Sequence, residues 1–255
     1  MKLLRRLFLL LLVLAAIGGI VAWTLPADLA LRWFKPDLGP LQLSGVSGTV
    51  WKGRAASVSA FNTSLGALDW SVQKTPLLLR QVAARVGLSG GAIRVDGDLT
   101  RDSDGSVLVR AMDFAFPAEL AAPALDIPSL KLHGRIEGRL DEARLAAGWV
   151  SGARGTARWR EAAVSGEAEA RLGEMIAEFA SQPDGSIAGT VKDDGSSNLE
   201  IAGQFTVQSG QFNATARLVA RNNDPQVTEA LRYIGEIQPD GSSLLKIHGQ
   251  LFKLF

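Results

Sequence analysis

The sequence predicts a mainly β protein, with a curved antiparallel β-sheet body, few short helices and one N-terminal transmembrane helix before it. Three observations support this fold class. From residue 41 onward, apolar residues alternate with polar residues or glycine over many short runs, a period of two that is typical of strands. Asp-Gly and Gly-Gly pairs separate these runs, as hairpin turns require. Only the start of the chain holds an uncharged apolar run long enough to cross a bilayer.

The overall composition excludes several classes of protein. The chain has 255 residues, of which 47% are hydrophobic and none is cysteine. It can therefore bury a core, but it has no disulfide framework, thiolate zinc site or cysteine nucleophile. The net charge is +1 and no basic block follows residue 6, so we expect no nucleic-acid partner.

The N-terminus indicates where the protein resides. Residues 1–6 (MKLLRR) are basic and predict a cytoplasmic N-terminus, and residues 7–25 follow without a charge. Nineteen helical residues at 1.5 Å each span roughly 28 Å, which matches a hydrocarbon core of about 30 Å. A cleaved signal peptide is the alternative, but its apolar core is shorter, and Trp23 lies where an interfacial aromatic residue belongs. We favour an uncleaved single-pass anchor in the cell inner membrane, with the bulk of the chain in the periplasm.

A first periplasmic β lobe is predicted over residues 26–116. It begins with a short helix over 26–34, where proline suits the first turn and apolar residues recur at helical spacing. The apolar face of this helix either lies on the membrane surface or packs under the β body. Strands start at Leu41, and Gly90-Gly91 and Asp104-Gly105 mark hairpin turns between alternating runs.

A proline-rich connection over residues 117–129 ends this lobe, because Pro117, Pro123 and Pro128 cannot donate to a central ladder. The second periplasmic β lobe is predicted over residues 130–255. Its start, LKLHGRIEGRL, partly repeats the stretch LQLSGVSGTVW of the first lobe, which predicts two versions of one β unit.

Two segments of the second lobe need separate arguments. Residues 168–180 fit both a helical stripe and strand alternation; because strands are predicted on both sides, we expect a strand. A helix is predicted near 225–234, since Asp224 can cap it, Pro225 suits its first turn and Gly235 can close it.

We expect no catalytic or metal-binding constellation. Residues 87–91 match the G-x-S-x-G of hydrolases, but that motif needs a helix after the turn. A strand is predicted there, so a hydrolase with Ser89 as nucleophile is the disfavoured alternative. The run from Asp102 to Gly105 resembles the start of a calcium loop without its later glycine and glutamate, and the two histidines lie far apart. The expectation is therefore no enzyme, no cofactor and no metal.

Candidate contact residues come from the stretch SGTVWKG. Trp51 either fills the inside of the curved sheet, where Gly48 and Gly53 let strands bend or approach closely, or contacts a partner subunit or a lipid headgroup. In the second case Lys52 and Arg54, beside it in the sequence, would take part. We favour the structural role for the tryptophan and keep these three residues as the candidate partner or lipid contact.

Several stretches together resemble a known family. They are L-x-L-x-G-V-S-G-T-V-W-K-G at 41–53, a Leu-Asp-Trp strand at 68–70, D-P-x-V-x-E-A-L-x-x-I-G at 224–235 and Q-P-D-G-S-x-L-L-x-I-x-G at 238–249. A charged N-terminus, an anchor and a Pro-Ala-x-Leu helix precede them. This arrangement resembles the type II secretion system protein N (general secretion pathway protein N) family over nearly the whole chain. Only the alanine-rich centre, 117–180, departs from it.

The resemblance implies a non-enzymatic inner-membrane component of the machinery that exports folded proteins from the periplasm across the outer membrane. Its implied partners are other type II secretion subunits and the inner membrane, and no motif residue has an assigned role. By architecture alone, the chain is also similar to AsmA-like envelope proteins, whose curved sheets form an apolar groove for lipids. Binding or conducting lipid along such a groove is therefore the alternative function.

Overall fold

The computed structural model describes residues 23–35, 41–60, 63–125, 131–166, 170–232 and 235–250. Its elements in chain order are α2 (Ala27–Phe34), β1 (Leu41–Gly48), β2 (Lys52–Ala60), β3 (Thr63–Gln73), η1 (Thr75–Leu79), β4 (Val82–Gly90), β5 (Arg94–Arg101), β6 (Val107–Pro117), η2 (Ala118–Leu125), β7 (Lys131–Ala146), β8 (Trp149–Ser165), β9 (Ala170–Ser181), β10 (Ile187–Asp193), β11 (Leu199–Gln208), β12 (Gln211–Ala220), η3 (Arg221–Asn223), α3 (Pro225–Leu231), β13 (Glu236–Ile237) and β14 (Ser243–Gln250). The predicted cytoplasmic N-terminus and all but the last three residues of the predicted anchor lie outside the described residues. Within the described part, no helix is both long and apolar enough to span a bilayer.

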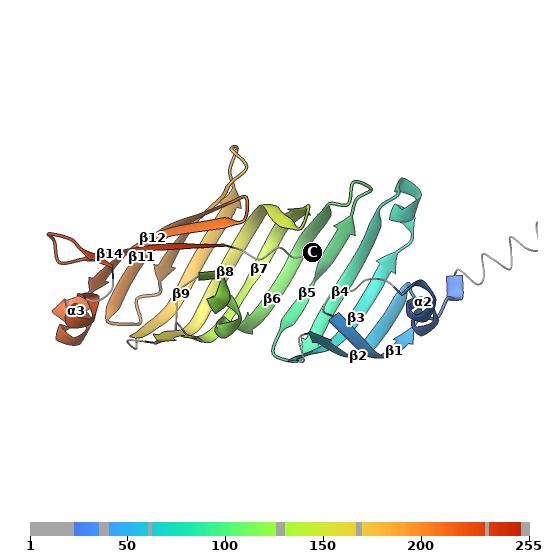
Figure 1. Ribbon diagram of the computed structural model, residues 1–255, viewed down its shortest axis with the longest axis horizontal. Helices are drawn as coiled ribbons and strands as arrows, with labels where there is room; N and C mark the ends of the chain where they lie inside the picture. Colours follow the sequence, from blue (N-terminus) through green and yellow to red (C-terminus); the bar gives the residue numbers. More distant parts are fainter. Residues whose placement is uncertain are drawn as a thin grey trace, which may run out of the picture.

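All 14 described strands form one antiparallel sheet, which confirms the mainly β class. Strands β1 to β12 pair in chain order. Only the last two exchange places, so that β14 pairs with β12 and β13 lies at the edge. Figure 1 shows the strands side by side along the long axis, from the blue end with α2 to the red end with α3. The fold is a meander, in which nearly every strand finds its partners among its neighbours in sequence.

The turn residues singled out in the sequence do close hairpins. Gly90, at the end of β4, has φ of 82°, a left-handed conformation that glycine adopts without steric cost. Four further turns share the sequence Asp-Gly-Ser, at 104–106, 184–186, 194–196 and 240–242. In each, the amide and hydroxyl of the serine donate to Oδ1 of the aspartate. The aspartate thus mimics a backbone turn and fixes the register of the flanking strands.

Bulges curve the sheet. Register shifts occur in the β2–β3, β5–β6, β7–β8 and β8–β9 pairs, and each extra residue bends its strand and increases the twist. At two of these sites a residue other than glycine takes positive φ: Ala111 at 47° and Glu161 at 50°. The resulting curl brings η2 beside both β7 and β14, which stand six places apart in the sheet order.

The core lies on one face of the sheet, in two clusters. The first runs across β6, β7, β8, β10 and β11 and contains buried Val109, Ala143, Ala153, Ile187 and Val207. The second lies at the red end, where Leu231 of α3 packs with the strand residues Leu199, Ile201 and Leu218. Helix α3 therefore covers the apolar face over β11 and β12.

The structure can be compared with the expectations for the ambiguous segment, the two helices and the proline-rich connection. Residues 170–181 form β9, so the ambiguous segment is a strand. The helices expected near 26–34 and 225–234 are found as α2 and α3. The predicted connection contains η2, but β6 and β7 on either side of it pair with each other. The sheet is thus unbroken there, and the division into two lobes stays a prediction.

Candidate functional site

Trp51 lies in the turn between β1 and β2 and is half-buried. Its carbonyl oxygen accepts a hydrogen bond of 2.7 Å from the amide of Val72 at the end of β3. Lys74 Nζ lies 5.1 Å from the Trp51 ring centroid and 2.9 Å from that of Trp23. The residues just before α2 and just after β3 therefore meet at this turn. The sequence does not predict that Lys74 and Trp23 meet at Trp51, because neither is close to it along the chain.

The tryptophan that lies on a glycine inside the sheet is Trp70. A Cβ placed on Gly53 would be only 2.4 Å from Trp70 Cζ2, and these two residues are paired across β2 and β3. Glycine is thus needed where an indole lies against the backbone. Trp70 thus lies against a strand glycine inside the sheet, while Trp51 stands at the end of the hairpin. The structural role expected of Trp51 stays a prediction.

Lys52 and Arg54 follow Trp51 on β2, where strand alternation places both on one face. Lys52 is exposed, and its amide donates to Thr49 Oγ1 at 3.1 Å. Arg54 Nη1 lies 3.8 Å from Asp69 Oδ1 with both side chains more than half exposed, a pairing that contributes little to stability. Their role in contacting a partner or a lipid stays a prediction.

A row of apolar side chains crosses β3 to β6 on the core face. Because directly paired residues share a face, the register of these strands places Leu68, Leu88, Val95 and Phe114 in one line. Trp70 and Val86 are paired beside them, and all six are half-buried. We call this set the apolar row: Leu68, Trp70, Val86, Leu88, Val95 and Phe114. Helix α3 covers only the far end of the same face.

The opposite face carries charged pairs between neighbouring strands. Arg139 Nη1 lies 2.9 Å from both carboxylate oxygens of Asp113, and Arg158 Nη1 lies 3.0 Å from Glu174 Oε1. Most of these side chains are about half exposed, so each pair contributes little to stability. The sheet thus has one apolar and one charged face.

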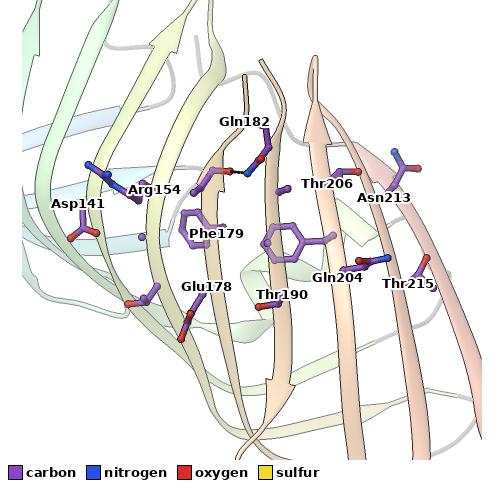
Figure 2. A pocket seen from close by; sticks show the side chains of 16 residues that line it. Asp141, Arg154, Glu178, Phe179, Gln182, Thr190, Gln204, Thr206, Asn213 and Thr215 are labelled. Atoms are coloured by element: carbon purple, nitrogen blue, oxygen red, sulfur yellow. Dashed lines mark hydrogen bonds between the residues drawn. The ribbon is translucent and has the colours of Figure 1, made fainter. Parts of the chain in front are cut away.

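An open groove of about 810 Å³ crosses β8 to β12, and its polar lining follows the strand register. Figure 2 shows the polar side chains spread over neighbouring strands, without converging on one point. Such a surface can hydrogen-bond an extended partner but offers no focus for catalysis. The lining residues paired in one line from β8 to β12 are Thr156, Glu178, Thr190, Gln204 and Thr215.

The geometry does not assemble a hydrolase. Ser89 lies in β4 and is followed by another strand, β5, where a nucleophile elbow needs a helix. His133 is three strands away on β7, with Nε2 2.7 Å from Ser165 Oγ, and His248 lies on β14 with Nδ1 2.7 Å from Asn213 Oδ1. Among the residues that the structure describes, no three His, Asp or Glu side chains are placed to hold a metal ion.

Among the described ion pairs, one has a buried carboxylate. The Asp193 carboxylate is 3% exposed and lies 2.7 Å from Arg221 Nη1. It also accepts hydrogen bonds of 2.8 Å from the amides of Ile201 and Gly195. Burial raises the pKa of Asp193, but the hydrogen bonds from Arg221 and the two amides outweigh it and leave the pKa below its usual value. This pair ties β10 to the start of the segment that carries α3.

Comparison with known proteins identifies similar sequences over most of the chain. Residues 39–246 match the family described as type II secretion system (T2SS), protein N. The type II secretion system protein N of Vibrio cholerae serotype O1 is 28% identical over 228 residues, which cover 85% of this chain and 86% of that protein. The protein of the same name from Aeromonas hydrophila is 25% identical over 246 residues, which cover 93% and 94%. No solved structure matches the chain significantly.

Proposed function

The chain belongs to the type II secretion system protein N family, and from this membership we propose that it works by contact, as a single-pass inner-membrane subunit whose β body lies in the periplasm. The family is a structural component of the secretion machine in the cell envelope and not an enzyme. Membership implies association with other subunits of that machine. In this proposal the subunit takes part in the export of folded proteins from the periplasm across the outer membrane.

The apolar row is the observation that supports a contact role. Its six side chains lie half-buried on one face of the sheet, whereas the other face is charged. Removing apolar surface from water is favourable, so such a face gains from being covered by a partner. We assign this row to the contact with another subunit of the secretion machine.

Secretion by a strain that lacks the gene tests the proposal. Deletion should stop the release of secreted enzymes, and the wild-type chain should restore it. The double variant Val86→Gln, Leu88→Gln polarises the apolar row on β4 and should not restore release. Arg85→Gln on the other face of the same strand is the matched control and should restore it. Immunoblots must show equal amounts of each variant in the envelope.

Two results would contradict this reading. If the deletion strain secretes normally, the subunit is dispensable for export and the contact role fails. If the double variant at normal abundance restores release as well as Arg85→Gln does, the apolar row is not the contact surface.

Lipid binding is the second candidate function, and the same continuous row favours it, because an acyl chain lying across paired strands would meet apolar atoms along its length. Native mass spectrometry of the purified full chain distinguishes the two. Co-purified phospholipid that is lost in the Val86→Gln, Leu88→Gln variant supports lipid binding. A lipid-free wild-type chain removes this candidate.

A further inference from the structure

The geometry points to a membrane-docking surface at the blue end of the sheet, which holds the β body against a bilayer with anionic headgroups. The surface consists of Trp23, Trp33, Phe34, Leu78 and Leu79, and we call it the N-terminal apolar surface. It is separate from the apolar row. Its orientation toward the inner membrane rests on the proposed function, but the lipid contact of the β body is a further property.

Exposed apolar side chains are concentrated in this part of the chain. Ten large hydrophobic residues are exposed among those that the structure describes, and eight of them lie within residues 23–82. Leu78 is 85% exposed and Phe34 75%. A lone exposed leucine needs no explanation, but such a concentration marks a surface with a partner.

The beginnings of the two segments that carry this surface are tied to the same turn between β1 and β2. Lys74, one residue before η1, lies over the Trp23 ring at 2.9 Å from its centroid. On the other side, Val50 N donates to Leu25 O at 3.1 Å, just before α2. Figure 1 shows α2 at the blue end of the sheet, beside β1 and β2.

Local sequence explains why the leucines of η1 face outward. The segment TPLLL forms a single 3₁₀ turn between β3 and β4, with Pro76 near its start and Arg80 in the left-handed conformation at its end. A connection of this kind runs over the surface and is normally polar. Here it presents Leu78 and Leu79 instead, and none of its five residues is buried.

The surrounding charges fit anionic headgroups. Arg32, Lys35, Lys52, Lys74 and Arg80 lie within or beside the same segments, and Asp28 is the one acidic residue of α2 and η1. None of these five forms an ion pair with another residue that the structure describes. Basic residues attract anionic lipids, while tryptophan and leucine enter the boundary between headgroups and acyl chains.

The position of this surface in the chain favours a bilayer as the occupant. The uncharged sequence run over 7–25 ends at the surface, since Trp23 belongs to both. If that run is in the bilayer, Trp23 lies at its boundary, and the residues held against Trp23 lie there too. The chain itself would thus place this surface next to a bilayer.

Site-directed spin labelling of the full chain tests the proposal, because the chain has no native cysteine. Leu79→Cys and Phe34→Cys would carry a nitroxide, with the protein in vesicles of one part phosphatidylglycerol to three parts phosphatidylcholine. We expect the nitroxides at both sites to be several-fold less accessible to an aqueous nickel reagent than a nitroxide at the control site, while they remain accessible to oxygen. Ile237→Cys, also exposed but at the red end, is the matched control and should stay accessible to the nickel reagent.

The other results each overturn the proposal. If the nitroxides at Leu79 and Phe34 are as accessible to nickel as the one at Ile237, the β body stands away from the bilayer. Flotation of the same vesicles shows separately whether the chain is still bound to them through its anchor. Protection from both nickel and oxygen indicates a protein contact instead. The Lys35→Gln, Arg80→Gln variant should weaken protection at Leu79; equal protection would remove the role of the cations.

Discussion

At the scale of single residues, Asp240 shows how the Asp-Gly-Ser turns are fixed. Hydrogen bonds from the Ser242 hydroxyl at 2.6 Å and amide at 3.0 Å, and then from Arg217 at 2.6 Å, hold the pKa of Asp240 down to about 2. A carboxylate whose pKa is lower in the folded than in the unfolded protein stabilises the fold at pH values above the pKa of the unfolded state. This stabilisation is lost as the pH falls toward and through the pKa of the folded state. The turn should therefore weaken between pH about 4 and about 2.

We expect Ser242→Ala, which removes the hydroxyl and keeps the amide, to raise the pKa of Asp240 more than Arg217→Gln does, because the hydroxyl of Ser242 makes the largest single contribution to the lowering. Carbon-detected NMR titration of the side-chain carboxyl group measures both shifts. The melting temperature of Asp240→Asn should also depend less on pH over the same acid range than that of the wild type. A larger shift for Arg217→Gln would contradict the assignment.

The buried carboxylate of Asp193 predicts a stability effect. Asp193→Ala deprives Arg221 and the amides of Ile201 and Gly195 of their acceptor, so the free energy of unfolding should fall by about 3 kcal/mol. Asp96→Ala, which removes a partner of Arg85 from a pair that is half exposed, should cost at most about 1 kcal/mol. Chemical denaturation of both variants provides the comparison, and equal losses would show that Asp193 is not buried in solution.

Single residues were the least predictable level from sequence. The Asp-Gly turns were predictable because their chemistry is local. The position of Trp51 was not, because its neighbours Lys74 and Trp23 come from segments far away in the chain, and alternation alone does not tell a strand residue from one at the end of a hairpin. The burial of Asp193 against Arg221 could not be predicted, since Asp193 looks in the sequence like an ordinary turn residue.

At the scale of elements, the β2–β3 pair depends on a glycine under a tryptophan. Gly53→Ala would place a Cβ 2.4 Å from Trp70 Cζ2 and 2.8 Å from Ser47 O, so we expect a loss of about 1–3 kcal/mol from overpacking. Gly87→Ala is the matched control, since a Cβ at this strand glycine meets only Asp96 Oδ2 at 3.4 Å. Thermal unfolding compares the two. A control as damaging as Gly53→Ala would mean that strand glycine itself, and not the tryptophan, sets the cost.

Element types followed from the period of the sequence, and element details did not. The strand at β9 was ambiguous because its apolar residues satisfy both periods; pairing with β8 and β10 decides it. The bulges at Ala111 and Glu161 are invisible to alternation, because they depend on how a strand must bend to follow its neighbours. The short helix η1 was missed for a similar reason: three leucines in a row give no period.

At the scale of the whole molecule, the meander predicts graded stability. Each strand pairs only with its neighbours in the sheet, so stability is approximately a sum of local terms and the sheet ends open first. β7 and β8 are the longest strands, with 16 and 17 residues, and α3 covers the red end. We expect hydrogen exchange to be slowest in β7–β9 and fastest in β1 and β2. One common opening rate for all strands would contradict this.

The overall architecture was predictable because it is built from neighbours. Hairpin turns and alternation predict that each strand pairs with the next one along the chain. A single sheet results when every strand pairs in this way. The exchange of β13 and β14 and the contact of η2 with β14 were not predictable, since both depend on the curl of the complete sheet. The two faces, one apolar and one charged, follow from alternation once the register is known.

The chain-order pairing has a consequence for biogenesis. As the chain emerges from a narrow channel, each new strand can pair at once with the strand that emerged before it. The growing sheet therefore has only one edge to which strands are still being added. The sheet can therefore assemble strand by strand from β1. The exception is at the C-terminal end, where β13 cannot pair until β14 has paired with β12.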